Sequence, residues 1–494
     1  MISTKVNDDH PFPVPGATTV CHVVALPYPG RSHINALMTF CKTLSSRLNL
    51  KHDNLTILIT FVLTEEWLGL IGSDPKPDNN IRFQTLPNVI PSEHVRANQL
   101  ADFYEAVATK LEAPFEELLV DLDNDKVRLP PVRIIVSDSL LGWPVEVGGR
   151  RNIPVASFWP LSGCMFSVLY HFDRFKQNGH FPIKLSERGH ELVDYIPGIR
   201  STRLSDISEN FFEKEDSKTM KIMLDAVSKV SQAQYFVSSS VYELESQLFD
   251  VLKPKFPFPI YPIGPLTTIN DPQFHHENGN YIEWLDSQPQ ASVLYISFGS
   301  FLSVSKTQLD EIVCGIRASG VRHVWVAREN VSSIKNGCGE MGFVVPWCDQ
   351  MRVLCHSSVG GFWTHCGWNS TMEAIYGGVP MLTFPIGGDQ FHNSKQIVED
   401  WKIGWKVKKK KKKIICEGTH HGDDDEMNLV RRDEICELVK IFMDQENNDR
   451  KVMGERMKQL QKLCQFAISK GGSSHTNIDA FINHILQPDK YRLL

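Results

Sequence analysis

The chain has 494 residues, a formal net charge of −6 at pH 7, and 42% hydrophobic and 22% charged residues. This length is too great for one ordinary hydrophobic core and predicts two domains of roughly 200 residues or more each. The mild acidity argues against general binding to nucleic acids or to anionic membranes.

The N-terminal half alternates segments that are typical of strands and of helices. Residues 1–16 are polar and lack the apolar region of a secretory signal, which predicts a cytoplasmic protein. Residues 19–26 predict a buried strand, and after a Pro/Gly turn apolar side chains recur at helical spacing from Ile34 to Leu48. Further strands are predicted at 55–62, 133–137 and 153–158, and a helix at 139–148. This rhythm indicates a parallel sheet with helices on both faces.

A proline-rich segment separates this half from a second series of strands and helices. We predict an N-terminal domain at residues 17–252, a linker at 253–285 and a C-terminal domain at 286–470. We expect the helix-like tail 473–490 to pack back on the N-terminal domain. No run of about 18 apolar residues occurs, so no membrane insertion is expected. The elements predicted in the second domain lie at 292–298, 307–318, 323–327, 361–364, 370–376, 379–384 and 393–401.

Cysteine spacing and charge runs predict neither a disulfide framework nor a metal site. The 11 cysteines include no Cys-x-x-Cys pair, which favours reduced and mostly buried thiols. Residues 408–413 are all lysine and residues 422–426 are rich in acids, which favours a solvated surface loop over a loop that docks on anions or membranes. The Asp-x-Asp sequences at 121–123 and 423–425 follow no strand and are interpreted as solvated.

The segment 347–390 holds the densest group of candidate binding residues. Residues 361–370 predict a strand, a loop and the start of a helix, with Asn369 or Ser370 as the N-cap and Glu373 completing a capping box. A helix start presents free N–H groups and the positive end of the helix dipole, which suits a pyrophosphate.

Other side chains of this segment have the chemistry that a nucleotide sugar requires. Trp347 offers a flat face for a base, His365 can donate to phosphates, and Asp389 with Gln390 suits sugar hydroxyls. Taken singly, such residues also have structural explanations: a helix cap for Glu373, a buried histidine, and core packing for Trp347 and Trp368. The number of fixed spacings within one segment favours a binding site.

At these residues the chain resembles the plant secondary-product UDP-glycosyltransferases of glycosyltransferase family 1, and within them the branch numbered 87. The resemblance covers the signature segment 347–390 and extends to residues 25–31, 262–265 and 296–300. It implies an α/β protein of the GT-B fold, in which two doubly wound Rossmann-like domains face a central cleft. It also implies a monomeric enzyme of plant secondary metabolism that needs no cofactor and no metal, with UDP-glucose as its co-substrate.

The resemblance assigns a role to each matching residue. Trp347 would stack on uracil, and Gln350 and Glu373 would bind the ribose. Gln390 is the family's usual mark of a glucose donor. The full set implied to bind the UDP-sugar is Ser300, Trp347, Cys348, Gln350, His365, Gly367, Trp368, Asn369, Ser370, Glu373, Asp389 and Gln390.

Two residues far outside this segment are the candidate catalytic pair. His33 follows the first predicted strand and Asp138 ends the strand at 133–137, and ligands bind at the carboxyl ends of strands in such sheets. Alone, they would be interpreted as a loop histidine and a helix cap. The resemblance implies instead a general base and its partner carboxylate. The implied reaction is a single displacement that inverts the donor's α-linkage to a β-glucoside on a small hydrophobic hydroxyl or carboxyl acceptor and releases UDP.

The chain departs from the family pattern in the region of the sugar. Pro160 stands where a hydroxyl residue is common, and Gly387 with Gly388 stand where a bulkier residue is usual. Two alternatives therefore stay open: a non-catalytic UDP-sugar-binding protein, and a transferase that uses another UDP-sugar. A nicotinamide or ATP enzyme is disfavoured because neither Gly-x-Gly-x-x-Gly nor a phosphate-loop Gly-Lys is present. The acceptor is not specified by short motifs.

Overall fold

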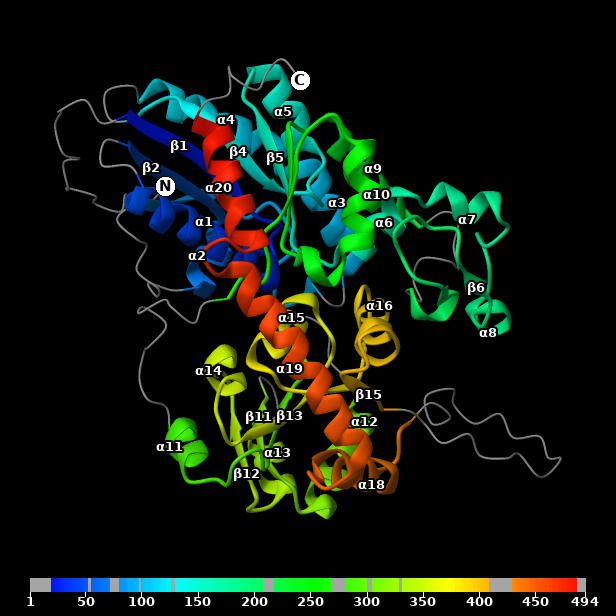
Figure 1. Cartoon of the computed structure of the whole chain (residues 1–494). Coiled ribbons are helices and arrows are strands. Elements are labelled where there is room, and N and C mark those ends of the chain that lie inside the picture. Colours follow the sequence, from blue (N-terminus) through cyan, green and yellow to red (C-terminus); the bar gives the residue numbers. More distant parts are fainter. Residues whose placement is uncertain are drawn as a thin grey trace.

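The computed structural model describes residues 19–51, 55–71, 80–96, 99–125, 129–207, 217–267, 280–299, 304–327, 331–407 and 429–486. Within these ranges two parallel sheets form the centres of two lobes that lie one above the other (Figure 1). The predictions for Ser300 and for the charged runs 408–413 and 422–426 lie outside the described residues.

The N-terminal lobe is built on a seven-stranded sheet with the order β3-β2-β1-β4-β5-β8-β9. Successive side chains of its strands enter two different cores: Val23 packs in one and Val24 in the other. Both faces of the inner strands β5 and β8 are buried along their whole length, which is why these strands are mostly apolar, whereas the edge strand β3 carries Arg82 and Gln84. The strands are β1 (Thr19–Leu26), β2 (Leu55–Thr64), β3 (Ile81–Leu86), β4 (Val132–Asp138), β5 (Val155–Trp159), β8 (Tyr235–Ser238) and β9 (Ile260–Pro262).

Helices cover both faces of this sheet, and a short antiparallel ribbon of β6 (Leu192–Val193) and β7 (Thr202–Arg203) lies beside it. The α-helices are α1 (Arg31–Lys51), α2 (Glu65–Ile71), α3 (Leu100–Lys110), α4 (Glu112–Asn124), α5 (Trp143–Arg151), α6 (Gly163–Tyr170), α7 (Asp173–Gln177), α8 (Leu185–Arg188), α9 (Lys218–Lys229) and α10 (Ser246–Leu252). The short 3₁₀ helices are η2 (Leu204–Asp206), η4 (Val230–Gln232), η5 (Tyr242–Leu244) and η6 (Lys253–Lys255).

The C-terminal lobe has a six-stranded sheet with the order β12-β11-β10-β13-β14-β15. Its strands are β10 (Val293–Ser297), β11 (Arg322–Val326), β12 (Gly342–Val345), β13 (Val359–Thr364), β14 (Met381–Thr383) and β15 (Gly404–Lys406). Its helices are α11 (Asn280–Asp286), α12 (Lys306–Ser319), α13 (Val331–Cys338), α14 (Gln350–Leu354), α15 (Trp368–Gly377), α16 (Gln390–Lys395), η8 (Gln396–Asp400), α18 (Arg432–Met443) and α19 (Asn448–Ile468).

In both sheets the order of strands reverses beside the first strand of the lobe. This point lies between β1 and β4 in one sheet and between β10 and β13 in the other, and both pairs are parallel. Ligands of doubly wound sheets bind outside the carboxyl ends of the strands at such a point. The topology therefore predicts one binding crevice in each lobe.

The C-terminal helix α20 (Ser473–Leu486) lies against the N-terminal lobe, although it follows the helices of the other lobe (Figure 1). Asn477 donates to the Pro262 carbonyl at 2.8 Å, and the Arg133 guanidinium donates to the Ile485 carbonyl at 3.2 Å. The ring of Phe481 lies 5.7 Å from that of Phe40 in α1. The last helix therefore ties the two lobes together.

One predicted boundary differs from the structure. Residues 260–262, placed by sequence in the linker, form the edge strand β9, where a proline such as Pro262 is tolerated because one side of the strand needs no ladder hydrogen bonds.

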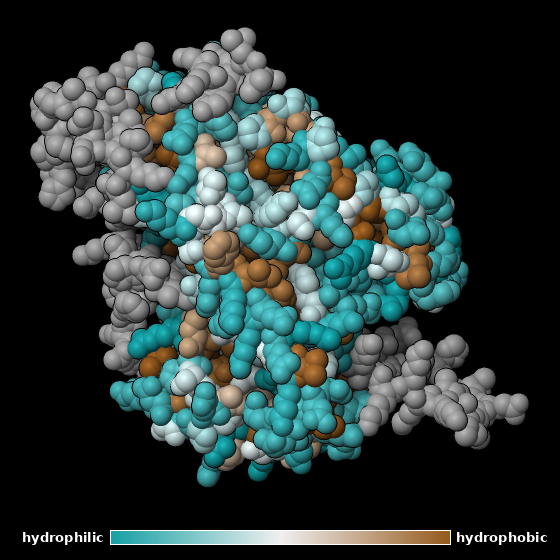
Figure 2. Space-filling model, viewed as in Figure 1, coloured by the Kyte–Doolittle hydropathy of each residue, from teal (hydrophilic) through white to brown (hydrophobic). Residues whose placement is uncertain are grey.

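Hydrophilic residues cover most of the face seen in Figure 2, with hydrophobic ones in small patches. Among the described residues, no helix has both the length and the apolar character that crossing a bilayer requires.

Candidate active site

His33 and Asp138 meet at the crevice of the N-terminal lobe. His33 lies in the first turn of α1 and Asp138 is the last residue of β4, and the parallel pairing of β1 with β4 brings these positions together. His33 Nδ1 lies 2.7 Å from Asp138 Oδ2. The other carboxylate oxygen accepts the Leu140 N–H at 3.0 Å. The predicted contact between the two residues is therefore present.

The burial of this pair orients the imidazole. The Asp138 side chain is fully buried, whereas that of His33 keeps 15% of its surface exposed. A buried carboxylate that accepts from Nδ1 selects the tautomer in which Nε2 is free of a proton. The imidazole thus presents Nε2 as a hydrogen-bond acceptor, the state that a general base needs.

The two lobes touch next to this histidine. Asn369, in the first turn of α15, donates its side-chain N–H to the backbone carbonyl of Ser32 at 2.9 Å. Asp389 is also close enough for the charge of His33 to act on it. Burial raises the pKa of Asp389 to about 6, and hydrogen bonding from Asn393 and the nearby His33 oppose that rise. The signature segment therefore faces the catalytic pair.

The start of α15 has no side-chain cap. The helix begins at Trp368 with Gly367 as its N-cap, so the predicted capping by Asn369 or Ser370 is wrong. Both side chains have other partners, since Asn369 bonds to Ser32 and the Ser370 hydroxyl accepts from Gln350. The N–H groups of the first turn remain available to an anion.

Close packing shapes the loops that precede this helix. His365 lies between two glycines, and a Cβ on Gly299 or Gly367 would come within 2.6 or 2.5 Å of His365 Nε2. Cys366 adopts a left-handed conformation with a φ of 69°. The tight turn places His365 directly before the helix start, where the sequence predicted a phosphate contact.

Polar side chains from three elements converge beside α15. Gln350 donates to the Ser370 hydroxyl at 2.9 Å and also to the Glu373 carboxylate. The Tyr295 hydroxyl donates to the side-chain oxygen Oε1 of Gln350 at 3.0 Å and lies 3.4 Å from the Cys348 sulfur. Burial raises the pKa of Glu373 to about 7, while the Gln350 hydrogen bond opposes that rise.

Trp347 lies next to this polar group with 55% of its surface exposed. The indole does not pack in the core of the lobe, because it lies outside both of the lobe's apolar clusters. The stacking platform predicted from the sequence is thus open to a ligand.

Gln390 and Asp389, the two polar residues expected to contact the sugar, have different hydrogen-bond partners. The side-chain oxygen of Gln390 accepts from the backbone N–H groups of Ile386 and Gly387 at 2.8 and 3.1 Å. Its amide nitrogen is therefore the group that it can offer to a ligand. Asp389 is held by the Asn393 amide at 2.8 Å.

Trp368 does not face the crevice with its ring. The indole is 2% exposed and packs against Trp401 in the core of the C-terminal lobe, at a centroid distance of 6.3 Å. The contact with the UDP-sugar that the resemblance implies for Trp368 therefore does not come from its ring, which points into the core at the start of the helix. Its backbone N–H, in the first turn, is the group left for a ligand.

Sequence reasoning missed two residues that support the site. Tyr295, on β10, orients Gln350, and no local motif signals a contact over this separation. Asn393 bonds both Asp389 and the Cys366 carbonyl, the latter at 2.9 Å. Its position four residues after Asp389, a helical spacing, is the signal that would have found it.

The chain is similar to known glycosyltransferases. A family model for "UDP-glucoronosyl and UDP-glucosyl transferase" matches residues 202–412. UDP-glycosyltransferase 87A1 of Arabidopsis thaliana is 48% identical over 464 residues, which cover 93% of this chain and 99% of the relative. UDP-glycosyltransferase 87A2 of the same plant is 47% identical, with 94% and 96% covered.

Solved structures share the fold. Medicago truncatula UGT71G1, complexed with UDP-glucose, superposes with a TM-score of 0.75 at 24% identity, covering 94% of this chain and 98% of that one. Phytolacca americana UGT2, complexed with UDP-2fluoro-glucose and pterostilbene, gives 0.77 at 23% identity, with 94% and 100% covered. The predicted two-domain α/β architecture is confirmed.

Proposed function

The chain belongs to the plant UDP-glycosyltransferases, in the branch numbered 87, and from this membership we propose that it transfers glucose from UDP-glucose to a small hydrophobic acceptor with inversion. The observation that supports this most is the His33–Asp138 pair, which lies beside the Asn369–Ser32 contact between the lobes. A base on one lobe is thereby adjacent to the helix start that receives the donor phosphates on the other.

In the proposed reaction, His33 Nε2 removes the proton of an acceptor hydroxyl while its oxygen attacks the anomeric carbon. Asp138 holds the ring and stabilises the imidazolium that forms. The oxygen–carbon bond forms as the bond to the UDP oxygen breaks, and UDP leaves with the electron pair. The free N–H groups at the start of α15, together with His365, Asn369 and Ser370, stabilise the charge on the leaving phosphate. With a carboxyl acceptor, the carboxylate attacks without needing that base.

The donor site is proposed on the C-terminal lobe. Trp347 stacks on uracil, the Cys348 backbone meets the edge of the base, and Gln350 with Glu373 binds the ribose. Ser300, outside the described residues, and Gly367 complete the phosphate contacts. Asp389, the Gln390 amide and the Trp368 N–H bind the sugar. We further propose that residues 17–252 form the domain that binds the acceptor and residues 286–470 the domain that binds the UDP-sugar. The protein is proposed to be a monomer that acts in the cytoplasm without a metal or other cofactor.

The donor and the acceptor class are tested together. The purified protein is incubated with UDP-glucose or UDP-galactose and a panel of phenols, terpenoid alcohols and carboxylic acids, and the products are analysed by mass spectrometry. We expect hexosylated products with UDP-glucose at a higher rate than with UDP-galactose. UDP binding without any product from the panel would favour the non-catalytic alternative, and faster transfer from UDP-galactose would contradict the proposed sugar.

Replacing Trp347 by alanine is expected to weaken UDP binding by roughly tenfold to a hundredfold, because stacking of a base on an aromatic ring contributes about 1–3 kcal/mol. The thermal midpoint should change little, since the ring is more exposed than buried. Isothermal titration with UDP measures the first effect and calorimetric unfolding the second. An unchanged dissociation constant would remove the proposed stacking contact.

Replacing Glu373 by glutamine is expected to weaken UDP binding roughly tenfold or more, because a hydrogen bond to a charged acceptor is lost from the ribose. Below a pH of about 7 the wild-type carboxyl is protonated in the free protein, so its UDP affinity should also fall as pH falls through 7. The variant should lack this part of the pH dependence. UDP titrations of both proteins from pH 5.5 to 8.5 give the comparison.

Replacing Glu373 by glutamine should also stabilise the UDP-free protein against unfolding at alkaline pH. A carboxyl whose folded pKa of about 7 exceeds its ordinary value of 4.5 favours folding when protonated, and this contribution is lost as pH rises from 4.5 through 7. Above pH 7 the wild type therefore carries a buried charge that glutamine lacks. A variant less stable than the wild type at pH 8 would indicate that Glu373 has a structural role.

A further inference from the structure

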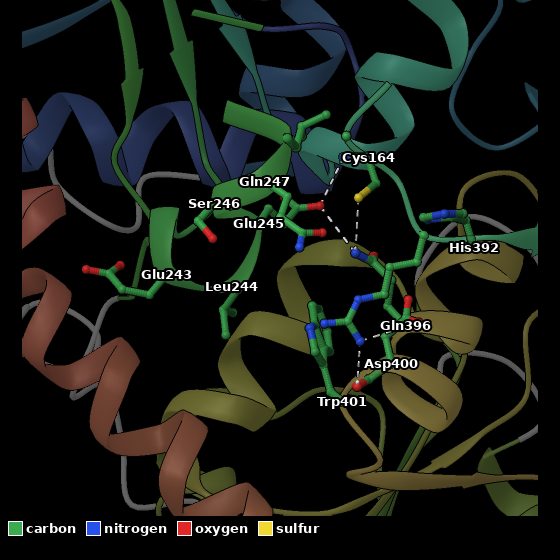
Figure 3. Close-up of a pocket in the computed structure, with 13 residues that line it drawn as sticks. Cys164, Glu243, Leu244, Glu245, Ser246, Gln247, His392, Gln396, Asp400 and Trp401 are labelled. Atoms are coloured by element: carbon green, nitrogen blue, oxygen red, sulfur yellow. Dashed lines mark hydrogen bonds and ion pairs between the residues drawn. The ribbon is translucent and has the colours of Figure 1, made fainter. Parts of the chain in front are cut away.

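A cavity of about 150 Å³ lies between the two lobes, and both lobes contribute to its wall (Figure 3). Cys164 and Glu245 come from the N-terminal lobe, and His392, Gln396 and Trp401 come from the C-terminal lobe. Figure 3 shows the Glu245 and Gln396 side chains pointing toward one another across this boundary. The proposed mechanism gives no role to Glu245, whose carboxyl group lies at this interface between the lobes.

Glu245 is buried, with 5% of its surface exposed, and both of its carboxylate oxygens are hydrogen-bonded. One oxygen accepts the Gly163 N–H at 2.8 Å and the Ser240 hydroxyl. The other accepts the Cys164 N–H at 3.0 Å and, from the opposite lobe, the Gln396 amide at 3.3 Å. Three of the four donors belong to its own lobe, and the fourth connects the lobes.

Two of the N-terminal partners of this carboxylate lie at the start of a helix that follows a central strand of the sheet. Gly163 and Cys164 are the first residues of α6, which begins four residues after β5 ends at Trp159. A Cβ on Gly163 would lie 3.0 Å from the Glu245 carboxylate and 2.4 Å from the end of the Leu248 side chain, so a larger residue here would require neighbouring side chains to shift. Glu245 therefore holds the start of α6, which follows β5 closely in the chain.

The C-terminal partner belongs to the element that carries the proposed sugar contacts. Gln396 is the first residue of η8, which continues directly from α16. Asp389 is the N-cap of α16 and Gln390 its first residue. Movement of Gln396 along this continuous helical segment would thus move both sugar contacts.

We propose that Glu245 is a positioning residue, whose hydrogen bond from Gln396 sets the place of the donor sugar relative to His33. This inference rests on the proposed function. The carboxylate holds the start of α6 on one side and the α16–η8 segment on the other. The sugar, bound by Asp389 and Gln390, thereby comes into line with the acceptor oxygen that His33 activates.

An ion pair between the lobes on the same helical segment is a weaker candidate for this role. Arg203 pairs with Glu399 at 2.8 Å, but the two side chains are 45% and 41% exposed. Exposed ion pairs contribute little because water and salt screen them. A hydrogen bond to a buried carboxylate is stronger, since little water competes for it.

The test replaces Gln396 by leucine, which removes the amide and leaves the Glu245 contacts within its own lobe. We expect kcat for sugar transfer to fall roughly tenfold to a hundredfold, the size expected for loss of one charge-assisted hydrogen bond. The UDP dissociation constant and the number of UDP sites per chain should stay within about twofold of the wild type, because the proposed UDP contacts all lie on one lobe. The matched control, Glu399→Gln on the same helical segment, should keep the wild-type kcat.

Two outcomes would overturn the positioning role: an unchanged kcat in Gln396→Leu, or a fall in kcat matched by an equal fall in UDP sites, which indicates unfolding. Glu245→Gln is the second variant. Its side-chain NH₂ group would replace an oxygen that accepts from a backbone N–H, so that two donors would face each other. This variant should therefore lower the thermal midpoint as well as kcat per UDP site. An inactive wild type would instead contradict the proposed function. An active wild type with an unaffected Gln396→Leu variant would contradict this inference alone.

Discussion

Turnover in the His33→Ala variant is expected to be lower by about 10² to 10⁴ than in the wild type, while UDP binding is retained. The imidazole is held by the fully buried Asp138 at 2.7 Å, so its Nε2 is oriented and can accept a proton. The proposed donor contacts lie on the other lobe. The loss should therefore appear in kcat with a hydroxyl acceptor, and steady-state kinetics with UDP titration measures both quantities.

A second histidine–aspartate pair provides the control for this prediction. His356 Nε2 lies 3.1 Å from Asp286 Oδ1, and Asp286 is exposed, far from the catalytic pair in sequence and on the other lobe. His356→Ala should keep the wild-type rate. If His33→Ala turned over a hydroxyl acceptor as fast as the wild type does, His33 would not be the base.

Replacing Asp138 by asparagine is expected to reduce kcat on the order of 10⁴-fold, as the corresponding exchange does in the serine-protease triad. The asparagine oxygen can still accept the Leu140 N–H, so the turn after β4 is kept. Its amide N–H₂ then faces His33 Nδ1, which must become the acceptor. The proton moves to Nε2, and the ring can no longer remove a proton from the substrate.

The asparagine variant should remain folded, with a UDP dissociation constant near that of the wild type. Calorimetric unfolding and UDP titration establish this before the rate is interpreted. A variant that is folded, binds UDP and retains more than about a tenth of the wild-type kcat would show that the tautomer is not decisive.

Sequence patterns predicted those features that arise from local regularity or from a short motif. The strand at 19–26 agrees with β1 because its apolar residues require burial on both faces. His33 and Asp138 were placed at the carboxyl ends of strands by the sequence and paired by the family resemblance, and the structure brings the two side chains together because β1 and β4 are neighbours.

The remaining features depend on contacts between distant segments. The start of α15 lies earlier than predicted because Asn369 and Ser370 bond outside their own helix. The Trp368 ring turns into the core, and β9 extends a sheet into a proline-rich stretch. No residue pattern near Glu245 specifies its contact with Gln396, which forms only when the lobes meet.

The anomeric configuration of the product shows whether the acceptor that His33 activates attacks the UDP-sugar in one in-line displacement. The wild-type protein is incubated with UDP-glucose, in which the sugar is α-linked, and with an acceptor from the panel that gives product. Proton NMR of the purified glycoside then gives the configuration from the coupling of the anomeric proton. We expect a β-glucoside, and an α-glucoside would contradict a single displacement.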